Sequence, residues 1–406
     1  MGDIYENSHI TIAATASGDS NGGLFSSDRP VTKRLEKHPH LYVRTALRKF
    51  PTNTQNTTPK SMPLLTRGWV YQERRLSHRT IHFGKHQVYW ECQTGFLSED
   101  SREDTVWDTN VAYFTDSYVT DWGDRCVDPK NYWQKIVTEY TALQLTYESD
   151  LLPAIAAVVD RMSRLQRVYD VYIAGLWKSS VLSDLLWSTQ DNKPRPSRMA
   201  PSWSWVSAQN SVVFWDDFEF TEQVKIVTLD YTIVGPANLG EVTDASIILM
   251  VPVLNLTGFD ELDAAEKGER RWSTRFKDIT KSAPVMEQFR QNNLEISNTW
   301  FYPDYDLTTA NPPFKCGCII KLLVARDSDA DMGGIVIQQT SKNPPEYKRI
   351  GFLGVGVMMT KSEMVGEKEE DLVRSDHDGE EKAGVRKGEH MGRLIMSLPM
   401  EEVKIV

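Results

Sequence analysis

Glu73 is the carboxylate in this sequence best placed for acid/base chemistry, because it lies beside Trp69 and Arg74 on a segment expected to be helical. Burial beside an aromatic ring shifts the pKa of a carboxyl group, as general acids and bases require. Arg67, Arg74 and Arg75 flank it, and a Glu among arginines is more often part of an ion-pair network. We therefore expect structural pairing, with catalysis by Glu73 as the alternative.

Arg67 and Arg74 are seven residues apart, which is two turns on one helix face. That spacing could hold an anion, or it could pair the two guanidinium groups with the carboxylates of Glu73 and Glu91. Internal pairing is again the favoured interpretation.

Histidine and cysteine side chains suggest nucleophilic or metal chemistry at the same end of the chain. His78, His82 and His86 recur every four residues, but they straddle a helix end, a strand and a hairpin, so we predict a surface His cluster and no metal site. Cys92 would act as a nucleophile only with a base such as His82 across the hairpin. A small buried core thiol is the preferred interpretation.

Two further motifs carry weak signals. Cys316-Gly317-Cys318 could chelate a metal or cycle redox state, but no second Cys or His pair stands at finger spacing, so we expect it to open a buried strand. The Gly18–Gly23 segment resembles a phosphate-binding loop but lacks the Lys-Ser/Thr of a Walker motif. It is interpreted as a connecting loop, and no cofactor is expected.

The Pro201–Trp205 segment alternates Trp with Ser, which is typical of a strand with one aromatic face. Trp203 and Trp205 would then point the same way. A stacking platform for a base or a sugar is one possibility, and packing under Trp177 and Trp187 is the more ordinary one.

Composition sets the class of protein. The 406 residues are 40% hydrophobic and 25% charged, close to average globular usage, and the length allows two or three domains. A net charge of -10 argues against a protein built to coat nucleic acid or an anionic membrane. The four cysteines are too scattered for a disulfide framework, and neither a signal sequence nor a membrane span is recognisable. We therefore expect a cytoplasmic protein.

The N-terminal half mixes helices and strands. Residues 10–14 are predicted to form a short buried strand, and residues 41–44 another. A helix capped by Thr66 or a neighbour, with Trp69, Val70 and Leu76 facing inward, should end at Leu76-Ser77. Strands over 80–83 and 88–92 are expected to form a hairpin. Residues 131–147 and 151–166 are predicted to be helices. The second helix would have Ser149 or Asp150 as its N-cap and Pro153 in its first turn.

Beyond residue 200 the pattern becomes period-two and β-branched. Expected strands span 224–234, 246–254, 318–325, 334–339 and 350–358, and the tail 394–406 returns to the sheet. Residues 260–308 are interpreted as a charged, partly helical insertion. The run of charged residues over 361–393 is predicted to be a solvated loop.

Four ordered blocks resemble the heterokaryon-incompatibility (HET) family of filamentous fungi. They lie at residues 4–25, 63–79, 82–92 and 175–205, and the second is similar to the family pattern L-x-x-RGW-x-x-QE-x-x-LS-x-R. The residues that carry the motifs are Arg67, Gly68, Trp69, Gln72, Glu73, Ser77, Trp90, Glu91, Cys92, Pro201, Ser202, Trp203 and Trp205.

The resemblance implies a fold and its division. It implies an α/β fold, a partial and distantly TIR-like HET core with a helical extension, followed by a β-rich C-terminal domain. We place the partial HET domain at 1–125, the helical extension with its Trp-rich closing segment at 126–206, and the β-rich domain at 207–406. The family's opening Y-x-x-LSY-x-WG and W-x-D-x-x-CI-x-Q strands do not occur here, so the N-terminal part of the domain is expected to be lacking and the chain alone to be weakly active or silent.

The resemblance also implies a function. It points to self/non-self recognition, with a role in heterokaryon incompatibility and cell-death signalling through a protein partner and not through metabolic catalysis. The alternatives are a TIR-like NAD or nucleotide hydrolase using Glu73, a small-molecule biosynthetic protein with an aromatic pocket, and a plain interaction scaffold.

Overall fold

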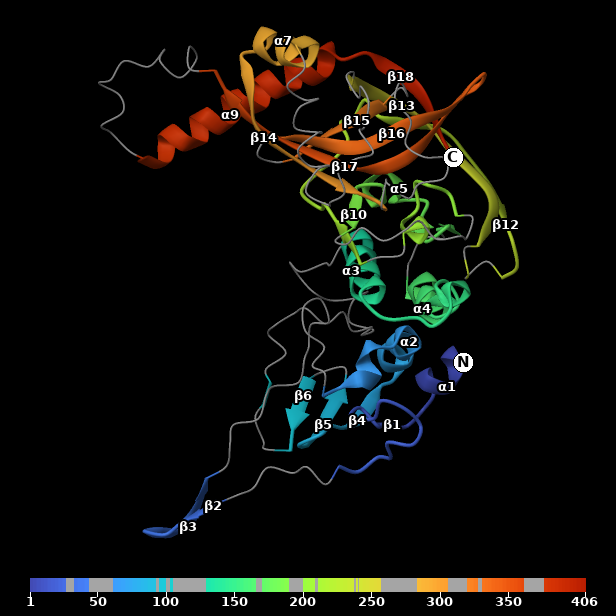
Figure 1. Ribbon diagram of the computed structural model, residues 1–406, viewed down its shortest axis with the longest axis vertical. Helices are drawn as coiled ribbons and strands as arrows, with labels where there is room; N and C mark the ends of the chain where they lie inside the picture. The colour runs from blue at the N-terminus through green and yellow to red at the C-terminus, as the bar shows by residue number, and fades with distance from the viewer. Residues whose placement is uncertain are drawn as a thin grey trace, which may run out of the picture. The chain divides into compact units, whose positions relative to one another are not determined.

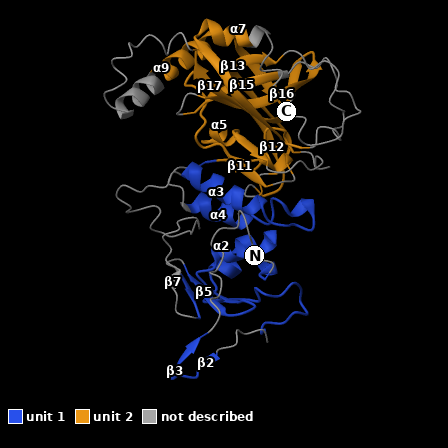
Figure 2. Cartoon of the chain, turned by 60° about the vertical axis from the view of Figure 1, so that its left-hand side comes forward, with its two compact units in different colours: residues 1–170 blue, residues 171–406 orange. Residues whose placement is uncertain are grey.

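The chain forms two compact units, Met1–Asp170 and Val171–Val406, which Figure 2 shows in different colours. The computed structural model describes residues 1–26, 33–43, 61–92, 95–99, 103–104, 129–165, 170–189, 200–208, 211–236, 239, 241–256, 283–305, 320–327, 331–360 and 376–406. The boundary between the units lies inside the expected helical extension. The division at residues 125 and 206 stays a prediction.

Unit 1 contains a five-stranded sheet in the order β1-β4-β5-β6-β7 (Figure 1). Its strands are β1 (Thr11–Ala13), β4 (Arg79–Phe83), β5 (Val88–Cys92), β6 (Gly95–Ser98) and β7 (Glu103–Asp104). β1 runs parallel to β4, and the other pairs are antiparallel. The predicted β4–β5 hairpin is confirmed. β1 is a strand as predicted, but Ile12 on it is 61% exposed because β1 lies at the edge of the sheet.

A separate two-stranded ribbon in unit 1 pairs β2 (Lys33–Leu35) with β3 (His38–Val43). It contains the strand expected near residue 41. All of its residues are exposed.

The helices of unit 1 are α1 (Gly2–Glu6), α2 (Gly68–Leu76), α3 (Pro129–Thr141) and α4 (Ala156–Leu165), with 3-10 turns η1 (Pro63–Thr66) and η3 (Glu148–Asp150). α3 ends earlier than predicted. α4 begins after Pro153, not around it, because residues 151–155 form turns. The stretch between the two helices carries residues that contact α2.

α2 starts and faces differently from the prediction. Its N-cap is Arg67, which makes no side-chain cap bond, whereas the hydroxyl of Thr66 donates to the Pro63 carbonyl. The buried residues of α2 are Gly68, Tyr71, Gln72 and Leu76, and Trp69 and Val70 are only partly buried. The hydrogen bonds and ion pairs of α2, described below, determine which of its sides faces inward.

Unit 2 opens with short elements. They are β8 (Tyr172–Ile173), β9 (Leu176–Trp177), α5 (Val181–Asp184), β10 (Trp187–Thr189), η4 (Trp205–Ser207) and β11 (Val212–Phe214). The strand predicted over Pro201–Trp205 is wrong. That segment makes a turn followed by η4, because the Ser204 hydroxyl accepts a hydrogen bond from the Val206 amide and caps the 3-10 turn.

The main sheet of unit 2 has the order β12-β13-β15-β16-β17-β14, and β18 pairs with both β13 and β17. β18 therefore closes the sheet into a ring. The strands are β12 (Lys225–Ile233), β13 (Val242–Leu256), β14 (Leu294–Pro303), β15 (Ile320–Arg326), β16 (Met332–Lys342), β17 (Pro345–Met359) and β18 (Met400–Ile405). The β-rich C-terminal region predicted from the period-two pattern is confirmed, and the tail returns to the sheet over Met400–Ile405, whereas residues 394–397 are helical.

Two helices belong to this sheet, α7 (Ala283–Gln291) and α9 (Asp376–Ser397). From residue 376 on, α9 contradicts the loop expected over 361–393, since Met391, Leu394 and Ile395 recur at helical spacing and pack into the sheet core. Residues 361–375 of that expected loop lie outside the described residues. β14 likewise falls inside the expected charged insertion. Phe301 of β14 is buried in that same core. The charged composition of the insertion did not indicate this buried strand.

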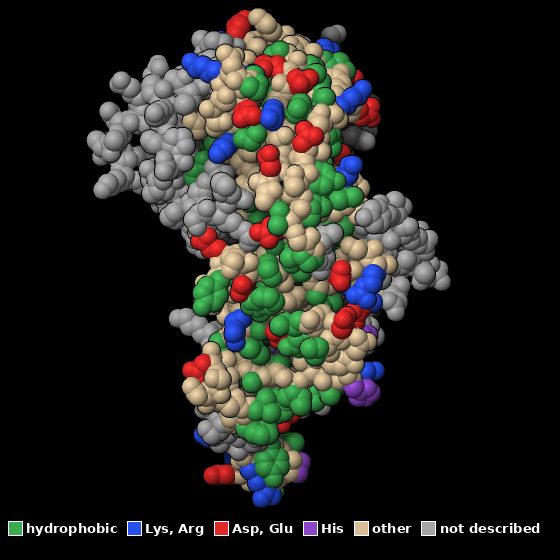
Figure 3. Space-filling view, turned by 90° about the vertical axis from the view of Figure 1, so that its right-hand side faces the viewer, with side chains coloured by type: hydrophobic (Ala, Val, Ile, Leu, Met, Phe, Trp, Pro, Cys, Tyr) green, Lys and Arg blue, Asp and Glu red, His purple; other side chains and the backbone are tan. Residues whose placement is uncertain are grey.

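Apolar side chains also remain on the surface of unit 1. Ile4 is 71% and Phe25 79% exposed. On the face that Figure 3 shows, hydrophobic side chains gather over unit 1, in the lower part of the picture, with charged ones between them. Within the described part of the chain, no helix is long and apolar enough to cross a membrane.

Candidate functional site

The start of α2 is fixed by its fit against the segment after α3. The Gly68 amide donates a 2.7 Å hydrogen bond to the Gln144 carbonyl, and the Gln144 amide donates one of 2.7 Å to the Thr66 carbonyl. A Cβ on Gly68 would lie 2.5 Å from Leu145 Cδ2. Glycine at this motif position is therefore explained by close packing.

Two side chains of the motif tie α2 to the segment that leads into α4. Trp69 Nε1 donates to Asp150 Oδ2 at 2.8 Å, and the Ala157 amide donates to Gln72 Oε1 at 3.3 Å. Gln72 is buried, so the hydrogen bond from Ala157 replaces one that its side-chain oxygen would otherwise make with water. Both residues thus have a structural role.

A second link joins α2 to α3. The Tyr71 hydroxyl donates to Glu139 Oε2 at 2.9 Å, and Arg75 pairs with the same carboxylate while its guanidinium lies 5.1 Å from the Tyr71 ring centroid. Burial first, and the nearby Glu139 charge, raise the pKa of Tyr71 well above its ordinary value, against the lowering effect of Arg75. The hydroxyl therefore stays protonated and acts as a donor.

The third link is a buried polar group that we call the His82 cluster: Thr15, Arg74, His82 and Glu91. His82 Nε2 lies 2.7 Å from Glu91 Oε2, and His82 Nδ1 lies 3.0 Å from Thr15 Oγ1. Arg74 Nε donates to both oxygens of Glu91, at 3.0 and 2.7 Å. The prediction that Arg74 pairs with Glu91 is confirmed, and the cluster joins α2, β4, β5 and the end of β1.

Electrostatics keep this cluster in one charge state. Burial alone would raise the pKa of Glu91, but the Arg74 charge and the His82 hydrogen bond lower it to about 2. For His82, burial lowers the pKa more than the hydrogen bond and charge of Glu91 raise it, and Arg74 lowers it further. At neutral pH the cluster therefore holds an ionised Glu91 and a neutral imidazole.

The order hydroxyl, imidazole, carboxylate superficially resembles a hydrolytic triad. Thr15 is 0% and His82 1% exposed, however, so no substrate reaches the hydroxyl in this conformation. Cys92 is not placed beside His82, and it is only partly buried, so the expected buried core thiol is wrong. It pairs with Arg79 in the β4–β5 register, whereas His82 pairs with Tyr89, so the two side chains lie on opposite faces of the hairpin.

Glu73 stands apart from these buried pairs. The Tyr5 hydroxyl donates a hydrogen bond to its carboxylate, and Arg67 attracts it electrostatically. Burial raises the pKa of Glu73 more than these two neighbours lower it. A part-buried carboxyl with a raised pKa is the one group of the motif, among the residues the structure describes, with a property suited to proton transfer.

The remaining sequence candidates separate in space. His82 is buried, His78 partly buried and His86 exposed, so the expected surface His cluster does not form; the alternation of β4 carries His82 inward. Within the described ranges, no three His, Cys, Asp or Glu side chains are grouped to hold a metal ion. Cys316 and Cys318 lie outside the described residues.

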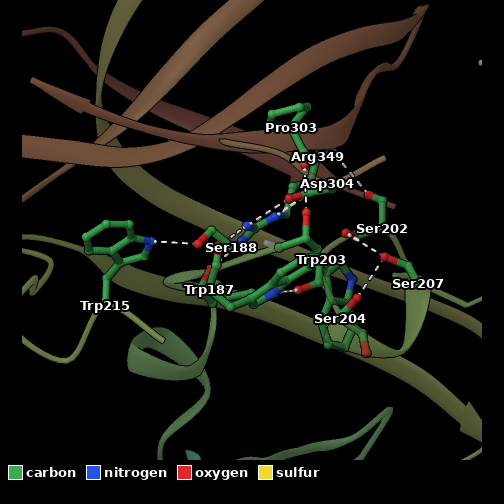
Figure 4. Close-up of polar contacts among 12 residues, drawn as sticks. Trp187, Ser188, Ser202, Trp203, Ser204, Ser207, Trp215, Pro303, Asp304 and Arg349 are labelled. Atoms are coloured by element: carbon green, nitrogen blue, oxygen red, sulfur yellow. Dashed lines mark hydrogen bonds and ion pairs between the residues drawn. The ribbon is translucent and has the colours of Figure 1, made fainter. Parts of the chain in front are cut away.

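The Trp-rich segment of unit 2 surrounds a buried arginine (Figure 4). Arg349 on β17 donates from Nε to Asp304 Oδ2 at 2.8 Å and from its terminal nitrogens to the carbonyls of Leu185 and Trp187. Its guanidinium lies 3.7 Å from the Trp187 ring centroid. Trp187 Nε1 in turn donates to the Trp203 carbonyl at 3.1 Å.

Ser202 and Trp205 complete this packing. The Ser202 hydroxyl donates to the Val406 carbonyl and accepts from the Arg349 amide at 3.1 Å. Trp205 Nε1 donates to the carbonyl of Gly175, whose φ of +88° suits glycine and whose missing Cβ leaves room for the indole. Trp203 and Trp205 are both fully buried, as the packing interpretation of the motif requires.

The comparison with known families now decides what unit 1 carries. The family model described as heterokaryon incompatibility protein (HET) matches residues 1–73. Residues 1–73 are similar to part of this family. No curated protein and no solved structure matches the chain.

The HET match covers α1, β1, β2, β3, η1 and the first part of α2, so it includes Tyr5, Thr15 and Glu73. The blocks at 82–92 and 175–205 lie beyond it. His82 and Glu91 nevertheless complete the cluster that begins with Thr15 inside the HET segment. The HET segment and the hairpin that follows it thus share one buried polar network.

Several residues of these networks escaped the sequence reasoning. Glu139 occupies a helical stripe with Tyr132, Ile136 and Tyr140, which could have indicated a buried carboxylate. Arg349 lies in the inward register of β17, two residues from buried Tyr347. In the sequence, nothing singled out Thr15, and Tyr5 stood out only as part of the first block, because each acts through a partner far along the chain.

Proposed function

We propose that this chain is a cytoplasmic HET-type protein of fungal self/non-self recognition that signals heterokaryon incompatibility and cell death through a protein partner. The HET match at residues 1–73 supports the family role. One structural observation supports signalling over metabolic catalysis: the motif side chains Trp69, Gln72, Arg74 and Arg75 are all engaged within unit 1.

A buried ion pair is costly to form and is strongly destabilising when one partner is removed. Side chains held this way have little capacity left to bind a substrate. Their effect is to fix α2 against β5, α3 and α4, so the motif specifies a conformation, which is what a partner recognises.

Inducible expression in a filamentous fungus tests the proposal. We expect strong overexpression to impair growth, since the chain alone is expected to be only weakly active, and we expect Glu73→Gln to retain the effect because signalling needs no catalytic carboxylate. Glu91→Leu, which leaves Arg74 and His82 without their shared partner, should abolish it. Normal growth with the intact chain, at protein levels verified by immunoblot, would refute the toxic role.

A second candidate function rests on Glu73 itself. Its raised pKa and its hydrogen bond from Tyr5 suit a general acid or base, and the distantly TIR-like core implied by the resemblance suggests NAD or a related nucleotide as substrate. Incubation of the purified chain with NAD, followed by measurement of nicotinamide release, distinguishes the two. Release that is lost in Glu73→Gln would replace the signalling proposal with hydrolysis.

A further inference from the structure

Two histidines of unit 1 take no part in the networks around α2. His38 and His40 lie on β3 of the two-stranded ribbon, and both side chains are exposed. Imidazole is the side chain that binds metal ions most often in proteins, and its nitrogens are accessible at an exposed position. The ribbon therefore presents two candidate ligands to the solvent.

The strand places these two side chains together. Residues two apart on a strand point to the same face, so His38 and His40 share one face of β3. Their ring centroids are 6.0 Å apart, with an interplanar angle of 78°. Two imidazoles that bind one ion at about 2 Å have their centroids about 4.5–6 Å apart. Rotation of the side chains alone can therefore direct both rings at one ion.

The backbone between the two histidines is held in place. Pro39 has a fixed φ, and it keeps the preceding residue, His38, in an extended conformation. From the neighbouring strand, Arg34 donates a hydrogen bond from Nε to the Pro39 carbonyl. Because the strand segment is already ordered, little conformational freedom is lost when both rings bind the same ion.

The chemistry of the pair selects the class of ion. Imidazole suits copper, zinc and nickel, whereas magnesium and calcium prefer oxygen ligands. Arg34 lies opposite Tyr42 in the ribbon, which puts its positive charge on the same face as the histidines. At this exposed position solvent and salt screen the charge, so it lowers the affinity for a cation without blocking the imidazole nitrogens.

We propose that His38 and His40 form a surface chelate for a divalent transition-metal ion, with Cu²⁺ bound more tightly than Zn²⁺. The order of the two ions follows from the general affinity series of nitrogen ligands. The two imidazoles supply the protein ligands, and water completes the coordination. The site needs only the ribbon, so it is independent of the proposed function and of Glu73.

Calorimetric titration of the full chain with Cu²⁺ tests the chelate. Mg²⁺ at about 10 mM is present throughout to occupy exposed carboxylates, which bind hard cations. We expect binding to weaken by about 10- to 100-fold in His38→Gln and in His40→Gln, because a single imidazole loses the advantage of two linked ligands. His9→Gln, which removes an exposed histidine outside the ribbon, should match the wild type.

Electron paramagnetic resonance of the complex with one equivalent of Cu²⁺ counts the ligands. The wild-type spectrum should show coupling to two imidazole nitrogens, and each single variant should show coupling to one. Wild-type affinity in both single variants, or a wild-type spectrum without two coordinated imidazoles, would overturn the proposal.

Pro39→Gly separates a prearranged pair from two independent histidines. The variant keeps both imidazoles, and we expect its affinity for Cu²⁺ to fall by about two- to fivefold because the free chain is less restricted. Unchanged hydrogen exchange of β4 and β5 shows that unit 1 remains folded. An affinity that Pro39→Gly leaves unchanged would refute the part assigned to the backbone.

Discussion

His82 Nε2 lies 2.7 Å from Glu91 Oε2 inside unit 1, and this contact couples the stability of unit 1 to pH. The pKa of His82 is lowered from 6.5 on folding, mainly by burial, so the unfolded chain binds more protons as the pH falls through that value. Folding lowers the pKa of Glu91 from 4.5 to about 2, so this group also destabilises the folded state on acidification, over a lower pH range. Through both groups, folded unit 1 therefore becomes less stable as the pH falls.

The first prediction concerns this pH dependence. We expect the protection of β4 and β5 amides against hydrogen exchange, corrected for intrinsic rates, to decline as the pH falls from about 7.5 towards 5. His82→Gln should flatten the decline over that range. The exposed His86→Gln is the matched control, and an equally flat profile for it would contradict the assignment to His82.

The second prediction concerns the charge pair of the same cluster. Glu91→Leu should lower the free energy of unfolding of unit 1 by about 3–5 kcal/mol, because it leaves Arg74, whose side chain is only 12% exposed, without its carboxylate. Adding Arg74→Met should recover much of the loss, since no isolated charge then remains. Hydrogen exchange of unit 1 peptides in a urea series measures both. A double variant no more stable than the single one would count against the pair.

The third prediction concerns the close approach at Gly68. Gly68→Ala should destabilise unit 1 by about 1–3 kcal/mol, because its Cβ would meet the Leu145 side chain. Leu145→Ala should reduce that penalty when the two changes are combined. Gly18→Ala is the control, since a Cβ on Gly18 meets nothing within 4 Å. Additive effects of Gly68→Ala and Leu145→Ala in the same urea series would show that the two sites are not in contact.

The fourth prediction concerns Arg349 in unit 2. Arg349→Met should cost about 3–5 kcal/mol, because Asp304 keeps its charge in a buried position, and Asp304→Asn in the same background should restore part of it. Lys404→Gln, which breaks a part-exposed pair with Glu346, should cost no more than about 1 kcal/mol. Urea denaturation followed by exchange of β17 peptides compares them. Equal effects of the two charge removals would refute the role of burial.

The sequence predicted most elements whose residues carry their own pattern. Val242–Leu256 and Pro345–Met359 are β-branched and alternating, so the sheet of unit 2 and the β4–β5 hairpin could be anticipated. Trp203 and Trp205 also alternate with serines, yet a single serine cap turned that segment into a 3-10 helix. Local patterns fail where one side-chain hydrogen bond outweighs periodicity.

The polar networks were anticipated less completely, because they depend on distant partners. The Arg74–Glu91 pair followed from the spacing of Arg67 and Arg74 on one helix face and from the nearby carboxylates. Glu139, Asp304 and Arg349 gain their roles from elements far away in the chain, which no local window contains. The interaction of Tyr5 with Glu73 likewise joins residues that are far apart in the chain.

The ring of unit 2 bears on how the protein is made. β13 needs β18 along one side, and the two strands are far apart in the chain. While the ribosome is still synthesising the intervening residues, β13 has an unpaired stretch and the apolar core lacks Val403 and Ile405. Sheets with non-local strand pairing of this kind fold slowly and pass through aggregation-prone intermediates. Unit 2 should therefore rely on chaperone protection during translation more than unit 1 does.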